Sequence, residues 1–214
     1  MDKRNKRILM SVFGVVIAGI SVGIFKRAAL GVDPFQSLMS GLNAVIPISF
    51  GTLYVIVNVL LLLFSVLMDR HKIGIATVIN LFFLGYIAEY SLKFFTRLVP
   101  EPGFAVRLVL LAAGVVIMCV ASAFYFTADM GVSTYDAVAL VWSEKQKKIP
   151  FRYCRIICDL VCVGLGVVLC LSAGFSWSQV GEAVGIGTII TAFFMGPLIE
   201  FFNIHVAKPF LEKN

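Results

Sequence analysis

Six long apolar segments dominate this sequence and limit the folds that it can form. A helix needs roughly 20 consecutive apolar residues to cross the hydrocarbon core of a bilayer. The segment from Leu53 to Met68 is typical, because only Asn58 and Ser65 interrupt it. Over the whole chain 60% of the residues are hydrophobic and 14% are charged, whereas a soluble domain carries about a quarter charged residues. We predict an all-α membrane protein with spans at about 8–29, 51–68, 74–92, 105–127, 152–172 and 184–203.

The first apolar segment shares one property with a secretory signal peptide, because a basic stretch precedes it. Its apolar run is longer than the roughly 7–15 residues of a signal-peptide core, and no small-x-small cleavage site ends it. We therefore predict that it is retained as the first spanning helix.

Basic residues fall unequally on the two sides of the predicted topology. With the N-terminus inside, the inner side holds Lys3, Arg4, Lys6, Arg7, Arg70, Lys72, Lys145, Lys147, Lys148, Arg152, Arg155, Lys208 and Lys213. The outer side holds Lys26, Arg27, Lys93, Arg97 and Arg107. Cytoplasmic loops carry an excess of Lys and Arg, so we predict that both termini are cytoplasmic. Because the net charge of +6 lies in short loops rather than on one face, we expect no nucleic-acid partner.

The two halves of the chain resemble each other in sequence. The third segment of each half matches best: Gly74–Tyr90 reads GIATVINLFFLGYIAEY and Gly185–Phe201 reads GIGTIITAFFMGPLIEF, with identical residues at eight of 17 positions. The first segments share Gly-Val-Val-Ile, at 14–17 and 114–117. The glycine and polar matches recur at fixed offsets, which an apolar composition alone does not explain. We infer an internal repeat.

Each repeat, at about 8–92 and 108–203, contains three predicted spans. An odd number of spans places the second repeat upside down relative to the first, within one integral membrane domain of residues 1–214. We therefore predict six transmembrane helices arranged as two inverted three-helix repeats. This symmetry is common in secondary transporters that work by alternating access, and it also occurs in channels.

A helix-start signal follows the first span of each repeat. Asp33 and Gln36 stand at the N-cap and N3 positions around Pro34, and Ser133 and Asp136 stand at the matching positions of the second repeat. We predict a short extra helix in each repeat, at about 34–45 and 134–146. These helices are compatible with two structures: capped connectors at the surface, or broken or re-entrant helices whose free N–H groups face a cavity.

Glu89 and Glu200 occupy equivalent positions near the ends of the third and sixth spans. Each shares a helix face with a glycine, Gly85 or Gly196, so we expect both carboxylates to point toward protein rather than lipid. One interpretation is structural, with each carboxylate accepting the unpaired N–H groups that start the short helix of its own repeat. The other is that they couple transport to an ion or a proton.

Asp159 is the most deeply placed acidic residue, two turns into the fifth span, and Arg155 lies one turn before it. Their counterparts in the first repeat are Asn58 and Tyr54. An ionisable group inside a membrane is a functional candidate, although Arg155 could simply reach the interface and neutralise Asp159. We predict that Asp159 and Arg155, facing Asn58, form the polar floor of a substrate or ion pathway.

Cysteines recur along one face of the fifth span, at Cys154, Cys158 and Cys162, and the stripe continues through Gly166 and Cys170. We interpret these small residues as the contact surface of a closely packed helix. The sequence shows no zinc-binding spacing, so we predict no metal or cofactor. It also shows no nucleotide-binding or hydrolase motif, and we do not expect an enzyme.

Several motifs resemble those of the bacterial YczE/YyaS/YitT-type membrane proteins. They are Gly31-Val32-Asp33-Pro34-Phe35, Phe50-Gly51-Thr52-Leu53-Tyr54, and Lys72–Thr77 followed by Gly85 and Glu89. The resemblance covers nearly the whole chain and implies a bacterial plasma-membrane protein of about this size, in a family mostly described as uncharacterised or transporter-like, without a settled substrate. Such proteins tend toward Gly-x-Gly-Thr before the third span; this chain has Ala76 there, whereas the second repeat keeps Gly187.

These features favour a secondary transporter or exporter of a small molecule. One alternative is a substrate-binding membrane subunit of a larger uptake complex, with Gly14, Ala18 and Gly19 as a small-residue face for a partner. Another is a lipid-handling or regulatory membrane protein. We expect membrane lipid and a small-molecule substrate as partners, and the sequence is compatible with H⁺ or Na⁺ coupling and with a homo-oligomer.

The basic-residue bias predicts where fused reporters will be found. Fusions at Asn43 and Gly174 should report an external location, and a fusion at Asn214 a cytoplasmic one, because odd and even numbers of spans precede them. Paired alkaline phosphatase and green fluorescent protein fusions measure this directly. An external C-terminus would contradict both the topology and the inverted repeat.

Overall fold

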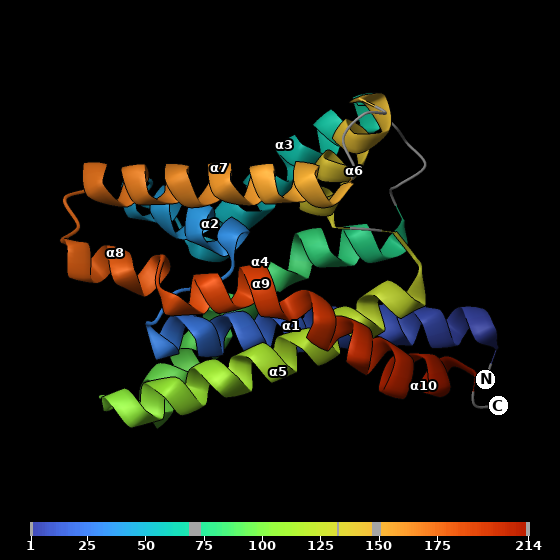
Figure 1. The fold of residues 1–214 in the computed structure, drawn as a ribbon, viewed down its shortest axis with the longest axis horizontal. Helices are drawn as coiled ribbons and strands as arrows, with labels where there is room; N and C mark the ends of the chain where they lie inside the picture. Colours follow the sequence, from blue (N-terminus) through green and yellow to red (C-terminus); the bar gives the residue numbers. More distant parts are fainter. Residues whose placement is uncertain (1, 69–73, 132, 147–150, 213–214) are drawn as a thin grey trace.

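The computed structural model describes residues 2–68, 74–131, 133–146 and 151–212, without the side chains of residues 140, 144, 151 and 152. All regular elements within this part of the chain are helices (Figure 1). Among the residues used above for topology, those outside the description are Arg70, Lys72, Lys147, Lys148, Lys213 and the side chain of Arg152.

Six stretches of the described chain are long and apolar enough to cross a membrane. They are formed by α1 (Lys3–Ala28), α3 (Phe50–Met68), α4 (Ile75–Leu98), α5 (Phe104–Ala128), α7 (Phe151–Ser172), and the series α8 (Trp177–Ala183), α9 (Ile186–Phe202), a π-helical segment (Asn203–Ala207) and α10 (Lys208–Glu212). Two shorter helices follow α1 and α5: α2 (Pro34–Val45) and α6 (Thr134–Gln146). The six predicted spans and the two predicted short helices are therefore confirmed.

The sequence analysis did not predict α8. Ser176 and Gln179 form a capping box there: the Gln179 N–H donates to Ser176 Oγ over 3.4 Å, and the Ser176 N–H donates to Gln179 Oε1 over 2.9 Å. The Ser-x-x-Gln spacing is a recognised helix-start signal. The apolar pattern of this region did not indicate a separate helix, because α8 is only seven residues long.

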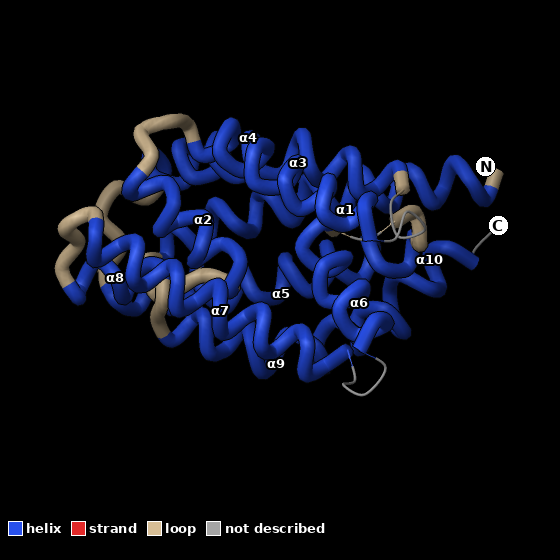
Figure 2. Tube along the Cα trace, turned by 90° about the horizontal axis from the view of Figure 1, so that it is seen from above, coloured by secondary structure: helices blue, strands red, loops and turns tan. Residues whose placement is uncertain are grey.

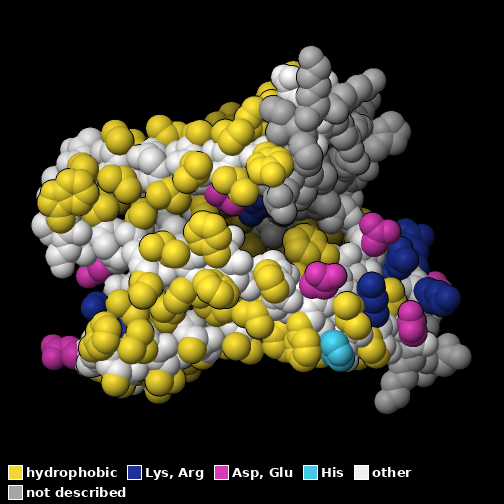
Figure 3. All heavy atoms as spheres, in the orientation of Figure 1, with side chains coloured by type: hydrophobic (Ala, Val, Ile, Leu, Met, Phe, Trp, Pro, Cys, Tyr) yellow, Lys and Arg dark blue, Asp and Glu magenta, His cyan; other side chains and the backbone are white. Residues whose placement is uncertain are grey.

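Large apolar side chains cover much of the outer surface (Figure 3). Leu67 of α3 is 82% exposed and Phe193 of α9 is 74% exposed, whereas Asn58 and Thr77 are 1% exposed. This distribution is inverted relative to a soluble protein, in which exposed apolar patches are limited in size. It is the distribution that a hydrocarbon solvent requires, so the chain is a multi-pass membrane protein.

The helices form two groups (Figures 1 and 2). In the lower group of Figure 1, α1 packs along both α4 and α5, and α9 packs on α5. In the upper group α2 lies along α7, and α6 contacts α3 and α7. Packing of α3 along α4 connects the groups. Both termini lie at the same end of the molecule (Figure 1).

Close packing of α1 depends on its glycines. A Cβ atom at Gly14 would lie 2.9 Å from the Ala121 carbonyl oxygen of α5, and one at Gly19 would lie 2.6 Å from the Ile87 side chain of α4. The face that carries Gly14 and Gly19 is therefore occupied within the chain. This contradicts its expected use as a docking face for a partner subunit.

The predicted small-residue contact of α7 is confirmed, and its partner is α2. A Cβ atom at Gly166 would lie 2.7 Å from the Ser37 carbonyl oxygen, and one at Gly41 would lie 2.7 Å from the Gly166 carbonyl oxygen. Cys154, Cys162 and Cys170 are buried along the same helix. The two glycines thus permit the close approach of α7 and α2.

Two equivalent turns connect the halves. After α1, Gly31 has φ +101° and the Leu30 carbonyl accepts the Gly187 N–H at the start of α9 over 2.7 Å. After α5, Gly131 has φ +113° and the Met130 carbonyl accepts the Ala76 N–H at the start of α4 over 3.0 Å. Each half thus supplies a carbonyl that accepts a backbone N–H at the start of a helix in the other half.

The same turn after α1 also explains why α8 is needed. The N–H groups of Gly31 and Val32 donate to the Glu182 and Ala183 carbonyls, over 3.1 and 3.3 Å. These carbonyls lie at the C-terminal end of α8, where no further helical turn supplies them with N–H donors. The short helix therefore satisfies the backbone of the turn, as well as connecting α7 to α9.

The two turns predict a matched set of glycine effects. Gly31→Ala and Gly131→Ala each place a Cβ atom 2.5 Å from a backbone nitrogen of the facing helix. Each should lower stability by roughly 2 kcal/mol or more. Gly174→Ala is the control, because its φ is +84° but nothing lies within 4 Å of its Cβ position; only the backbone cost of about 1 kcal/mol remains. Thermal unfolding in detergent measures all three, and equal losses would contradict the close approach.

Candidate functional site

A cavity of about 580 Å³ lies between the two groups of helices. Side chains from α1, α3, α4, α5, α7 and α9 line it, together with the first residues of α2 and α6. Figure 3 shows a hollow between α7 and α9, with acidic and basic side chains inside it. Ala192 and Gly196 of α9 are cavity-lining residues that are exposed at this opening. The cavity is therefore built by both halves and opens sideways.

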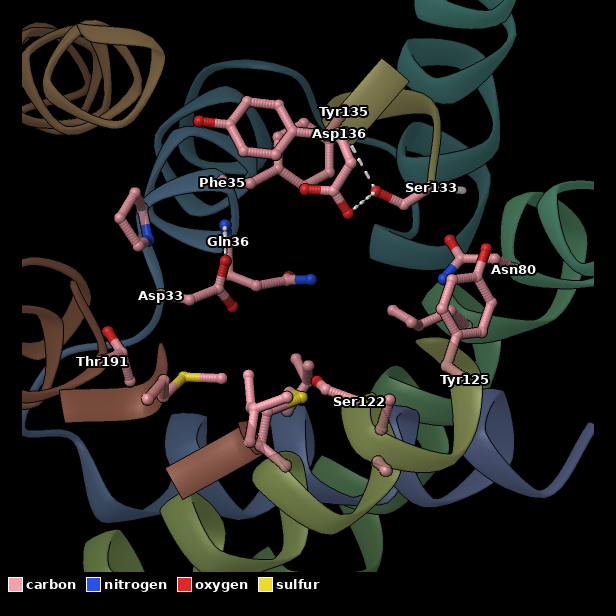
Figure 4. A pocket seen from close by; sticks show the side chains of 18 of the residues that line it. Asp33, Phe35, Gln36, Asn80, Ser122, Tyr125, Ser133, Tyr135, Asp136 and Thr191 are labelled. Carbon is pink, nitrogen blue, oxygen red and sulfur yellow. Dashed lines mark hydrogen bonds between the residues drawn. The ribbon is translucent and has the colours of Figure 1, made fainter. Parts of the chain in front are cut away.

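The two short helices begin at this cavity (Figure 4). Asp33 Oδ1 accepts the Gln36 N–H over 3.2 Å at the start of α2. Ser133 Oγ accepts the Asp136 N–H over 3.0 Å at the start of α6 and donates to Asp136 Oδ2 over 2.6 Å. Both predicted caps are confirmed. Since Phe35 is buried beside them, α2 starts inside the protein rather than as a surface connector.

Arg155 joins α7 to the start of α6. Its guanidinium forms ion pairs with Asp136 and, over 3.2 Å, with Asp159. The Tyr135 hydroxyl donates to Asp159 Oδ1 over 2.6 Å, and the guanidinium carbon lies 4.5 Å from the centre of the Tyr135 ring. Arg155 therefore interacts with two carboxylates at the cavity wall, Asp136 and Asp159, rather than with Asp159 alone.

Asn58 occupies the opposite side of the α6 start. Its carboxamide oxygen accepts the Thr134 hydroxyl, and its nitrogen donates to the Tyr54 carbonyl over 2.8 Å. The Tyr54 hydroxyl donates to Asn80 Oδ1 over 3.3 Å. Asn58 and Asp159 thus hold adjacent residues of one helix start, and the structure brings both to the same cavity.

Asp33 has no such ion pair among the interactions of the described residues. Burial raises the pKa of its carboxyl to about 6, against the opposing effect of the Gln36 N–H hydrogen bond. Because this folded-state pKa exceeds the ordinary 3.8, the folded protein takes up a proton between about pH 4 and 6. The stability contributed by that proton is present below pH 4 and is lost as the pH rises through 6.

Glu89 and Glu200 lie away from the cavity. Glu89 accepts the Gly51 N–H over 3.1 Å and the Lys93 ammonium over 2.8 Å. It therefore pairs with the start of α3 rather than of α2, which corrects the expected partner. Glu200 is exposed on α9, so the expectation that it points toward protein was wrong, because the Gly196 face of α9 is open rather than packed.

The structure adds side chains that the sequence analysis did not select. Phe35 and Tyr135, the second residues of α2 and α6, stack with their ring centres 4.9 Å apart. Thr134 and Asn80 complete the hydrogen bonds described above. The equivalent positions of Phe35 and Tyr135 in the two helix-start motifs are the signal that could have identified this pair. In the part of the chain that the structure describes, no group of three His, Cys, Asp or Glu side chains could hold a metal ion.

Comparisons with known proteins give a family but no activity. The family model described as "Family of unknown function (DUF6198)" matches residues 5–204. The "Uncharacterized protein YyaS" of Bacillus subtilis is 22% identical over 94% of each chain. An "Uncharacterized protein" of Haemophilus influenzae is 23% identical over 95% of this chain and 86% of its own. No solved structure matches. The match to YyaS confirms the resemblance that the sequence motifs indicated.

The Arg155 ion pairs generate a test of coupling. Arg155→Met strands two carboxylates and should lower stability by roughly 2–3 kcal/mol, below the cost at a fully buried site because the cavity is open. Adding Asp136→Asn and Asp159→Asn should restore more than half of the loss. Thermal unfolding in detergent measures both proteins. A triple variant no more stable than the single one would show that Arg155 contributes by packing alone.

Proposed function

The chain belongs to the DUF6198 family of unknown function, and we propose that it is a secondary transporter or exporter of a small molecule in the bacterial plasma membrane. The observation that carries this proposal is the cavity between the halves, at which α2 and α6 both begin. Its volume of about 580 Å³ lies within the roughly 300–1,000 Å³ of small-molecule sites. Helix starts and polar side chains at the centre of an apolar helical protein are typical of substrate sites in transporters.

An inverted repeat is part of the proposal. The matched positive-φ glycines Gly31 and Gly131 and the matched backbone hydrogen bonds to Gly187 and Ala76 support it. So does the packing of α1 against α5, the first helices of the two repeats. With three spans in each repeat, the second would be inverted, and both termini would be cytoplasmic.

Alternating access would then arise from rocking one group of helices against the other around the cavity. The two turns are the backbone contacts about which such a motion would occur, because each joins one half to a helix of the other. Asp33, with its raised pKa, is the residue best suited to couple the motion to H⁺. A Na⁺ site would use the same carboxylates.

Lipid handling is the second candidate function, and the sideways opening between α7 and α9 favours it. A cavity that opens toward the bilayer can admit a molecule from the membrane as well as from water. A substrate-binding subunit of a larger complex is disfavoured, because Gly14 and Gly19 pack against α5 and α4.

Cysteine accessibility tests alternating access without a known substrate. In a variant whose five native cysteines are replaced, Ser122→Cys places a thiol at the cavity. A membrane-impermeant thiol reagent added to right-side-out vesicles should label this thiol from the external face of the membrane. The same reagent added to inverted vesicles should label it from the cytoplasmic face. The two rates should change in opposite directions when the pH crosses 6. The matched control, Ala123→Cys, is 0% exposed and not in the cavity lining, and should stay unlabelled.

Two other labelling patterns would contradict the proposal. Labelling from one side only, at every pH between 5 and 8, would indicate a receptor or a closed structural protein. Labelling from both sides at rates that never trade off would indicate a fixed pore.

A further inference from the structure

A second, smaller cavity adjoins the central one. It has a volume of about 280 Å³ and lies between α2, α3, α6 and α7, and the described residues of its lining include no charged one. Phe35 and Tyr135 line both cavities. Their rings stack with an interplanar angle of 21°, so one aromatic pair lies between the cavity that contains the carboxylates and an apolar one.

The described lining of the central cavity contains more acidic than basic side chains. Among the described residues, Asp33, Asp136 and Asp159 line it together with one cationic residue, Arg155. Arg155 is engaged by Asp136 and Asp159. Asp33 has backbone N–H donors alone, from Gln36 and Phe35, among the described residues, and a carboxylate can accept further hydrogen bonds. When ionised, the side chains leave an excess of negative charge beside Asp33.

Gln36 adds an acceptor at the same place. Its side chain is 4% exposed and points into the cavity with its amide nitrogen foremost (Figure 4), and its Oε1 atom is buried without a hydrogen-bond partner within the described structure. A half-turn of the amide about its terminal bond exchanges the two atoms and brings Oε1 to the cavity. A buried oxygen without a donor is costly. Asp33 and Gln36 lie on the first turn of one helix, so a single ligand group could donate to both.

Resting on the proposed function, we propose that the central cavity binds an amphipathic organic amine as its substrate. Its ammonium group donates to Asp33 and to Gln36 Oε1, and its hydrocarbon body lies against the Phe35–Tyr135 pair. An ammonium has three donors and no acceptor, which matches the vacant acceptors. Aromatic faces attract cations as well as apolar groups, and the opening between α7 and α9 leaves room for the hydrocarbon body to extend toward lipid.

The charged and titratable groups around Asp33 determine how pH acts on this site. They are Lys26 from α1, Tyr54 from α3, and Arg155, Asp159 and Cys162 from α7. The Lys26 ammonium interacts electrostatically with Glu89 as well as with Asp33. It lies 3.0 Å from the centre of the Phe50 ring, and Lys26 is not in the cavity lining. An amine competes with a proton for Asp33, so its affinity should fall by about tenfold per pH unit well below pH 6.

Equilibrium binding to the purified full chain in detergent tests the inference. The probe is 3-phenylpropylamine, with 3-phenylpropan-1-ol and 4-phenylbutanoate as neutral and anionic analogues. Isothermal titration calorimetry at pH 7.5 should show the amine binding at least about tenfold more tightly than either analogue. Equal affinity for amine and alcohol, or no amine binding to folded protein at millimolar concentration, would overturn the proposal.

Asp33→Asn isolates the carboxylate. Asparagine caps a helix as well as aspartate does, so the fold should persist, and the raised pKa predicts that the melting temperature at pH 8 will not fall. Amine affinity should fall at least about tenfold and lose its pH dependence, while alcohol affinity stays constant. The control is Asp129→Asn, a carboxylate that is 84% exposed and not in the cavity lining. Unchanged amine affinity in Asp33→Asn would refute the site.

Two further arms separate the sources of the amine and the failures of the two proposals. Lysophosphatidylethanolamine carries the same ammonium next to a phosphate, which the carboxylates repel; tighter binding of this lipid than of phenylpropylamine would overturn the choice of a soluble amine. Flux of phenylpropylamine into proteoliposomes tests transport. Amine binding without flux would reject the transporter and keep the amine site. Flux of an anion without amine binding would reject the amine site and keep the transporter.

Discussion

The fold depends on backbone hydrogen bonds that cross between the halves at Gly31 and Gly131. Where a chain breaks its helices inside the protein, the freed N–H and C=O groups must find partners within it. Here the Leu30 and Met130 carbonyls accept N–H groups at the starts of α9 and α4. Positive φ at the two glycines turns the chain sharply enough for this contact. Because each half completes the other, the cavity between them is held by shared backbone rather than by side chains alone.

The polar side chains follow from the same breaks. Once α2 and α6 begin inside the protein, their first N–H groups need acceptors, and Asp33 and Ser133 provide them. Asp136 then needs a cation, which Arg155 supplies while also holding Asp159. The result is a cluster in which most groups have partners. Among the described residues of the cavity lining, Asp33 has no ion pair, and Gln36 Oε1 and the Tyr125 hydroxyl have no hydrogen-bond partner.

Much of this arrangement could be predicted from local sequence signals. Apolar runs located the spans, and the Asp-Pro-x-Gln and Ser-x-x-Asp patterns located both short helices to the residue. The candidates at 33, 36, 54, 58, 136, 155 and 159 all line the cavity. Glu89 and Glu200 could not be placed, because their surroundings depend on which helix packs beside them. The stripe of small residues along α7 likewise did not indicate which helix packs against it, and only the structure shows that this helix is α2.

That pairing of α2 with α7 affects how the protein is made. The Ser37 hydroxyl donates to the Ala183 carbonyl over 2.8 Å, across 146 residues of chain. Synthesis proceeds from the N-terminus, so α2 leaves the ribosome long before the surface that buries it exists. The first three spans must therefore wait in the bilayer with a short, incompletely packed helix until α7 and α8 are inserted. The last third of the chain thus completes the folding of the first, and a chain that ends before α7 leaves α2 without the surface that buries it.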